Sequence, residues 1–241
     1  MRTIKSLLLL TIVLASLSFV GWKTIKGNGV LKKETRQMAD FNGLASGGPV
    51  NVTILYGSNN SIEVEGDENV LPHLETYVKD NKLNIRPENG VTLKSQNPIR
   101  VTVSMTKMTE ISMSGSGEIN GEGNFSNDAE TEINMSGSGN IKLAFGKFKD
   151  LSISMSGSGN IQLKGSPTGS LSTSQSGSGN INCTDVEAEN VSVKISGSGN
   201  AKVNATKSID ARISGSGDIY YKGTPQNVDS KVAGSGRIQK L

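Results

Sequence analysis

The sequence predicts an all-β protein, a parallel β-solenoid with about 20 residues per coil. The tripeptide Gly-Ser-Gly occurs seven times in the C-terminal half, at steps of 18 to 22 residues. Apolar residues alternate with polar ones on both sides of each tripeptide, which is the pattern of β-strands with one buried face. A repeat of this length cannot bury its apolar face alone, so we expect successive copies to stack as coils, with parallel strands in register.

An up-and-down meander of hairpins would show the same alternation. It would need a second tight turn in each repeat, whereas the segments that connect the copies vary in length and composition. One recurring corner combined with one variable arc favours the solenoid over the meander.

The chain begins with a predicted signal peptide, residues 1–18. Arg2 and Lys5 precede a mostly apolar run over residues 7–20, which is shorter than the roughly 20 residues that span a bilayer. Cleavage is expected after Ser18, with an uncleaved N-terminal anchor as the alternative. We therefore predict export to the periplasm, the cell envelope or the medium.

Net charge excludes some partners. The chain has 25 basic and 22 acidic residues, and removal of Arg2 and Lys5 with the signal peptide leaves 25 − 2 = 23 basic residues against 22 acidic ones. A net charge near +1 gives no electrostatic basis for binding nucleic acid.

The segment 19–108 is expected to form irregular β coils and a cap. Polar and apolar residues alternate over 50–54, 62–64, 83–85 and 99–105, and turn-rich clusters separate these strands. A cap is needed because the open end of a solenoid exposes unpaired strand edges.

Residues 109–241 hold the seven repeats, continuous with the preceding segment. The first glycine of each tripeptide is expected at a sharp corner, because glycine adopts positive φ without steric cost. The corner glycines are Gly115, Gly137, Gly157, Gly177, Gly197, Gly215 and Gly234. The position two residues before each corner is expected to point into the core, as a row. The core row is Met113, Met135, Met155, Ile195, Ile213 and Val232, with Gln175 at this position in the fourth copy.

The opposite side of the same strands is polar and is expected to face water. One outward row is Ser114, Ser136, Ser156, Ser176, Ser196 and Ser214, ending in Ala233. A second is Ser112, Asn134, Ser154, Ser174, Lys194, Arg212 and Lys231. Ladders of hydroxyls can hydrogen-bond a repeating ligand such as a glycan, and the alternative is that serine only keeps the face soluble and uncharged.

The residue after each corner is asparagine in four copies, and stacked amides can bond along such a ladder. Calcium-binding repeats need an aspartate in every copy, and only Asp218 stands at this position, so we expect no metal. Phosphate-binding loops need a third glycine and a following helix, which are absent here. The sequence therefore predicts no nucleotide and no cofactor.

The repeated Ser-Gly-Ser-Gly-Asn-Ile frame lies behind a β-rich segment that reads Gly48-Pro49-Val50-Asn51-Val52-Thr53-Ile54. Together they resemble the head GIN domain family, described as auto-transporter adhesins and typical of Bacteroidetes-type bacteria. The resemblance covers residues 37–238. It implies a right-handed β-helix-like fold, no assigned catalytic residues and a role in adhesion.

The enzymatic alternative is a polysaccharide lyase or glycosidase on a β-helix. Glu110 and Glu132 each precede a corner by five residues, so stacking would bring both carboxylates close enough for glycoside hydrolysis. Mutual repulsion would then raise the pKa of one of them. A solvated acidic face is the simpler interpretation. His73 is the single histidine and lacks a recognisable catalytic partner, and Cys183 occupies a core position and is expected to be an inert thiol.

We therefore predict an exported, non-enzymatic protein of the cell envelope, an adhesion or structural binding module that presents a Ser/Asn-rich solenoid face. A glycan or a cell-surface protein is the expected kind of partner.

Overall fold

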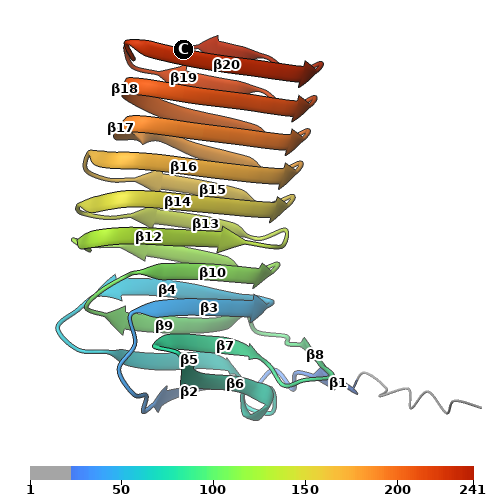
Figure 1. Cartoon of the computed structure of the whole chain (residues 1–241). Helices are drawn as coiled ribbons and strands as arrows, with labels where there is room; N and C mark the ends of the chain where they lie inside the picture. Colours follow the sequence, from blue (N-terminus) through green and yellow to red (C-terminus); the bar gives the residue numbers. More distant parts are fainter. Residues whose placement is uncertain (1–22) are drawn as a thin grey trace, which may run out of the picture.

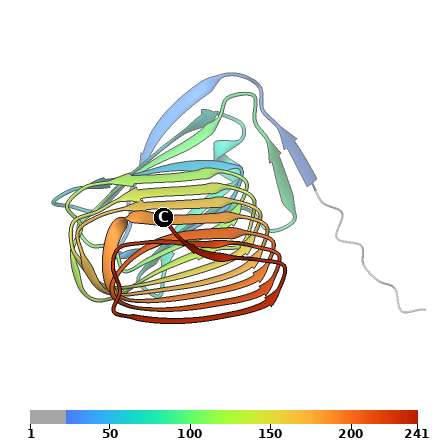
Figure 2. The same ribbon diagram turned by 90° about the horizontal axis from the view of Figure 1, so that it is seen from above.

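The computed structural model describes residues 23–241 and confirms the predicted fold class: flat coils stack into one column of parallel strands (Figure 1). Each coil contributes one strand before its corner and one after it, and the strands form two ladders. Viewed along the stack, the coils superimpose as nested loops around a common interior (Figure 2). The signal peptide predicted for residues 1–18 lies outside the described residues. Within 23–241 no helix combines the length and apolarity needed to cross a membrane.

The first ladder consists of the strands that precede the corners. In spatial order it contains β7 (Lys82–Pro87), β3 (Gly43–Gly48), β10 (Glu110–Gly115), β12 (Asn127–Met135), β14 (Phe148–Gly157), β16 (Thr168–Gly177), β17 (Asn180–Gly197), β18 (Asn200–Gly215) and β20 (Asn227–Gly234).

The second ladder consists of the strands that follow the corners. It contains β9 (Ile99–Met105), β4 (Val50–Tyr56), β11 (Glu118–Glu122), β13 (Asn140–Ala144), β15 (Asn160–Lys164), the first parts of β17 and β18, β19 (Ile219–Lys222) and β21 (Ile238–Lys240).

Antiparallel strands close the N-terminal end of the column. Strand β6 (Leu74–Lys79) pairs with β7, while β5 (Ser61–Asp67) pairs with β9 and β2 (Leu31–Arg36) pairs with β5. Strands β1 (Lys23–Lys26) and β8 (Val91–Lys94) form a separate parallel pair. A single 3-10 turn, η1 (Leu71–His73), leads into β6.

The stacking order differs from the chain order at this end. The coil formed by β3 and β4 lies between the pair β7 and β9 on one side and the pair β10 and β11 on the other. Gly48 is in register with Gly115, so Gly48-Pro49-Val50 makes a further corner that lacks the Gly-Ser-Gly sequence. This coil therefore joins the cap to the repeats.

The core row occupies the interior of the column. Met113, Met135 and Met155 are in register and no more than 3% exposed, and Ile195 and Ile213 are also buried. The rest of the interior is filled by a second inward row of the first ladder, which includes Ile111, Ile133 and Ile153, by the second ladder and by the variable arcs. From the arcs come aromatic rings such as those of Phe145 and Phe148, which stack with their centroids 4.3 Å apart.

Val232 departs from the expectation for the core row, because its side chain is 42% exposed. It belongs to β20, which pairs with β18 on one side only, and within residues 23–241 no coil covers its other side. An inward-facing position in an end coil remains open to solvent for this reason.

The corner glycines are required by close stacking more than by backbone conformation. Positive φ occurs at five of the seven, Gly157, Gly177, Gly197, Gly215 and Gly234, so the expected conformational reason holds for those copies and does not extend to the first two. A Cβ on any of the seven would collide with the carbonyl oxygen of the glycine one coil below; for Gly177 this oxygen belongs to Gly157.

The second glycine of each corner from the second copy on also lies against the carbonyl oxygen of its counterpart one coil below, and it has a core-row side chain as a further neighbour. A Cβ on Gly159 would collide with Sδ of Met135, and a Cβ on Gly179 would collide with the thioether of Met155. Each core-row side chain therefore fills the space that the glycine of the next coil leaves free. The close stacking of the corners therefore requires both the glycines and the core-row side chains that pack against them.

We expect Met135→Asp to unfold the middle coils, because it places an unpaired charge between Met113 and Met155, a class of change that costs several kcal/mol. Ser136→Asp should be tolerated, since the Ser136 side chain is exposed on the opposite side of the strand. Urea unfolding followed by circular dichroism measures both. Equal loss of stability in the two variants would contradict the inward and outward assignment.

Gly137→Ala should destabilise the protein by about 1–3 kcal/mol, the usual cost of overpacking, because Gly137 does not have positive φ and the new methyl group meets the backbone of Gly115. Gly43→Ala is the matched control: it lies in β3 of the same ladder, and a Cβ there has its nearest neighbour, Cγ of Lys82, at 3.4 Å. Thermal melting should separate the two variants. Similar melting temperatures would refute the role assigned to close stacking.

Candidate binding groove

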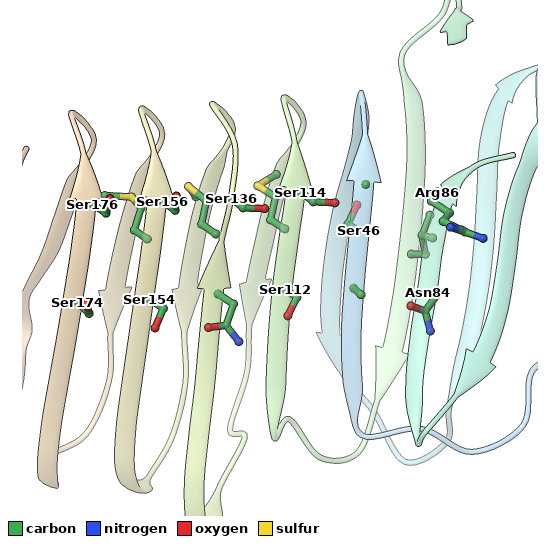
Figure 3. Close-up of a pocket in the computed structure, with 17 residues that line it drawn as sticks. Ser46, Asn84, Arg86, Ser112, Ser114, Ser136, Ser154, Ser156, Ser174 and Ser176 are labelled. Atoms are coloured by element: carbon green, nitrogen blue, oxygen red, sulfur yellow. The ribbon is translucent and has the colours of Figure 1, made fainter. Parts of the chain in front are cut away.

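A groove with a volume of about 520 Å³ runs across the outer side of the first ladder (Figure 3). It crosses β7, β3, β10, β12, β14 and β16, and its outward polar side chains are Asn84, Arg86, Ser112, Ser114, Asn134, Ser136, Ser154, Ser156, Ser174 and Ser176. The first four members of each outward row expected from the sequence thus line one continuous depression.

The register of the first ladder sets the spacing of these hydroxyls. Ser154 is in register with Ser174, and Ser156 with Ser176, so equivalent hydroxyls repeat at the strand separation of about 4.8 Å. These four side chains are exposed and make no side-chain hydrogen bond within residues 23–241. Their donors and acceptors are free for a ligand.

Each end of the groove carries positive charge. At the cap end, Arg86 forms an ion pair with Glu75 (Nε–Oε2 3.0 Å) and lies over the ring of Tyr77. At the other end a second hollow of about 350 Å³ continues along the same side, where Lys194, Arg212 and Lys231 are in register.

Arg212 is largely neutralised at that far end. Its guanidinium pairs with Asp210 at 2.9 Å and with Asp229 at 3.0 Å. The hydrogen bond and charge of Asp210, followed by those of Asp229, raise the pKa of the guanidinium. The middle of the groove is a lattice of uncharged hydroxyls.

The candidate acids Glu110 and Glu132 are adjacent in register, as the sequence indicated. The expected rise in pKa does not occur at Glu110. Burial alone would raise the pKa of Glu110, but hydrogen bonds from Lys82 Nζ and from Ser112 Oγ (2.8 Å), together with the charge of Lys82, hold the pKa below its ordinary value. Glu110 is an ionised, ion-paired group and is not poised to donate a proton.

The other reactive residues are occupied structurally. Nδ1 of His73 lies 2.8 Å from Oε2 of Glu88, at the end of the 3-10 turn. Cys183 is fully buried, and burial raises the pKa of its thiol to about 12, which keeps it protonated and unreactive. Over residues 23–241 no cluster of three His, Cys, Asp or Glu side chains is placed to hold a metal ion.

The asparagine row links the coils, as the sequence suggested. Asn160 donates to Asn140, Asn180 to Asn160, and Asn200 to Asn180, over 2.9 to 3.1 Å. The row continues through Asp218, whose backbone N–H donates to Asn200. This ladder of amides stabilises the corners and leaves no set of oxygens convergent on a cation.

Asn84 and Arg86 were not identified as groove residues from the sequence. They belong to β7, which reaches the groove because the β3–β4 coil stacks against both the cap and the repeats. The one available signal was the glycine at 48, which stands where the repeats have a corner glycine.

A column of stacked β-coils with a long groove across one ladder, lined by serine hydroxyls, defines a β-solenoid repeat protein. Residues 40–225 match the family model described as "Putative auto-transporter adhesin, head GIN domain". The chain belongs to this family, which confirms the resemblance seen in the sequence.

Solved structures share the fold. A putative adhesin from Bacteroides fragilis superimposes with a TM-score of 0.84 at 24% identity, over 90% of this chain and 100% of that one. A "putative lipid binding protein" from Parabacteroides distasonis gives 0.71 at 28% identity, over 91% and 100%. A putative adhesin from Parabacteroides merdae gives 0.67 at 25% identity, over 91% and 99%. No curated protein matches the sequence.

We expect the Lys82–Glu110 pair to make stability depend on pH. The folded-state pKa of Glu110 lies below its ordinary value of 4.5, so the carboxylate stabilises the fold above about pH 4.5, and this contribution is lost as the pH falls through the folded-state pKa. Glu110→Gln should therefore lower stability at pH 7 by about 1 kcal/mol and have little effect near pH 3.

Glu132→Gln is the control, because Glu132 is exposed and stands at the same position one coil away. Melting temperatures between pH 3 and pH 7 (about the range over which a carboxyl titrates) would measure the difference. A loss in Glu110→Gln that grows toward low pH would show that the pKa is raised instead.

Proposed function

We propose that this protein is an exported, non-enzymatic module of the cell envelope that adheres to an extended polar ligand through the groove on its first ladder. The observation that carries the proposal is the set of free hydroxyls on β14 and β16: Ser154, Ser156, Ser174 and Ser176 are in register, exposed and without side-chain hydrogen bonds, in a groove of about 520 Å³. A repeating polymer can use the same contact on each coil.

The family description and the similar solved structures support a surface-binding role. The family model and two of the similar structures carry the description of adhesins, which are cell-surface proteins. The apolar run that follows Arg2 and Lys5 supports export through a signal peptide.

The chemistry of the groove favours a glycan or an extended segment of a cell-surface protein. Hydroxyl rows satisfy ligands that carry their own hydroxyls or amides. One similar protein is described as lipid-binding, but an acyl chain would leave these serines unsatisfied, which costs free energy. The ion pair between Lys82 and Glu110 supports a non-enzymatic role.

Ser156→Arg tests the groove, because it places a long charged side chain on the floor in the middle of the hydroxyl lattice. Binding to glycan arrays and to immobilised cell surfaces should fall at least about tenfold, which corresponds to 1.4 kcal/mol. Ser158→Arg is the matched control: it is exposed in the same coil, at the corner and outside the groove. Equal binding by the two variants would refute the groove as the adhesive surface.

The same preparations should release no product from a panel of polysaccharides. Turnover that disappears in Glu110→Gln or in Glu132→Gln would establish the carbohydrate-active enzyme instead.

A further inference from the structure

A second hollow lies on the outer side of the second ladder, around the corner from the groove. Its volume is about 450 Å³. It is lined by Asn180, Asn182, Asn200, Lys202, Asp218 and Tyr220, with Ile181 behind them. This is a polar hollow with one aromatic wall, a combination that the groove lacks.

The amide oxygens of the hollow are already used within the protein. Oδ1 of Asn180 accepts from Asn200 at 3.1 Å, and Oδ1 of Asn200 accepts from the backbone N–H of Asp218 at 3.1 Å. Oδ1 of Asn182 accepts from the backbone N–H and the hydroxyl of Thr184 at 3.2 and 2.9 Å. The amide NH₂ groups keep free protons, so the amides face the hollow as donors.

The one carboxylate in the hollow is also satisfied. Asp218 accepts from Arg237 Nη2 at 3.2 Å and from the Tyr220 hydroxyl at 3.1 Å. The hydrogen bond from Arg237 is the main reason that the pKa of Asp218 lies below its ordinary value. Asp218 is therefore ionised, and the guanidinium of Arg237 neutralises its negative charge.

Lys202 supplies a positive charge that has no such match. Its Nζ lies 5.7 Å from the centroid of the Tyr220 ring, with which it is in register on the neighbouring coil. Across residues 23–241 no carboxylate lies within ion-pair distance of this ammonium. The equivalent lysine three coils below, Lys142, pairs with Glu118 at 2.8 Å.

We propose that this hollow binds an acidic sugar residue of a glycan. The carboxylate of the sugar forms an ion pair with Lys202 and accepts a hydrogen bond from the Asn182 amide. The hydroxyl oxygens of the sugar accept hydrogen bonds from the remaining amide protons, and the sugar ring packs beside Tyr220. A surface that offers donors, one free cation and an aromatic wall selects a ligand rich in acceptors, with one negative charge and one apolar face.

The inference goes beyond the proposed function, because it concerns the other ladder and none of the groove residues. A ligand of the groove contacts the first ladder, whereas the acidic sugar contacts the strands that follow the corners. Substitutions in the groove and substitutions in the hollow therefore test the two sites separately.

Isothermal titration of the purified protein with oligogalacturonate tests the proposal, in low salt. The methyl ester of the same oligosaccharide removes the charge and keeps the sugar ring, and sodium sulfate supplies the charge without the ring. We expect the acidic oligosaccharide to bind and the affinity for its methyl ester to be at least about tenfold weaker, the ordinary worth of a charge-assisted hydrogen bond.

Lys202→Gln should weaken binding of oligogalacturonate about tenfold, and Tyr220→Ala should do so to a similar extent. Gln162 stands in the same outward row as Lys202, so glutamine is compatible with the strand. Tyr220→Phe should leave the affinity nearly unchanged, because the ring is kept. Lys142→Gln is the matched control and should have no effect.

Three results would overturn the proposal: no binding of oligogalacturonate, undiminished binding by Lys202→Gln with an intact circular dichroism spectrum, or displacement by sulfate at equal concentration, which would indicate a simple anion site. Loss of binding in Ser156→Arg with full binding in Lys202→Gln would place this ligand in the groove and not in the hollow.

Discussion

The structure depends on how closely the backbones of successive coils approach at their corners. The approach leaves no space for a Cβ at either glycine, and the space beside the second glycine is taken by a core-row side chain from the coil below, such as Met135 beneath Gly159. Backbone hydrogen bonds then continue through the corner, from Gly179 to Gly157 for example. Alignment at the corners fixes the register of both ladders, and the register in turn places the serines one above another.

The sequence predicted the solenoid because its two strongest signals, the spacing of Gly-Ser-Gly and the two-residue alternation, arise directly from stacking. The positions of Met113, Met135 and Met155 followed from the same pattern. The reason for the glycines was only partly predicted, because a collision with the coil below is a property of neighbouring coils and leaves no mark within a single repeat.

The candidate sites were less accessible to sequence reasoning. Two rows of serine were visible, but the groove also uses Asn84 and Arg86 from β7, which reaches it only through a stacking order that differs from the chain order. The partner of Glu110 was hidden for the same reason, since Lys82 lies 28 residues earlier and arrives on the other side of β3. Contacts between strands that are distant in the sequence leave no periodic pattern in the local sequence.

The position of the β3–β4 coil separates the molecule into a part whose contacts are unique and a part whose contacts repeat. On the cap side of this coil each strand contacts a different set of partner residues. On the repeat side each coil contacts its neighbours through nearly the same residues. A duplication or loss of one 20-residue unit within the repeats would therefore lengthen or shorten the hydroxyl lattice by one step while leaving the cap untouched. The length of the proposed binding surface would therefore change in steps of one whole coil.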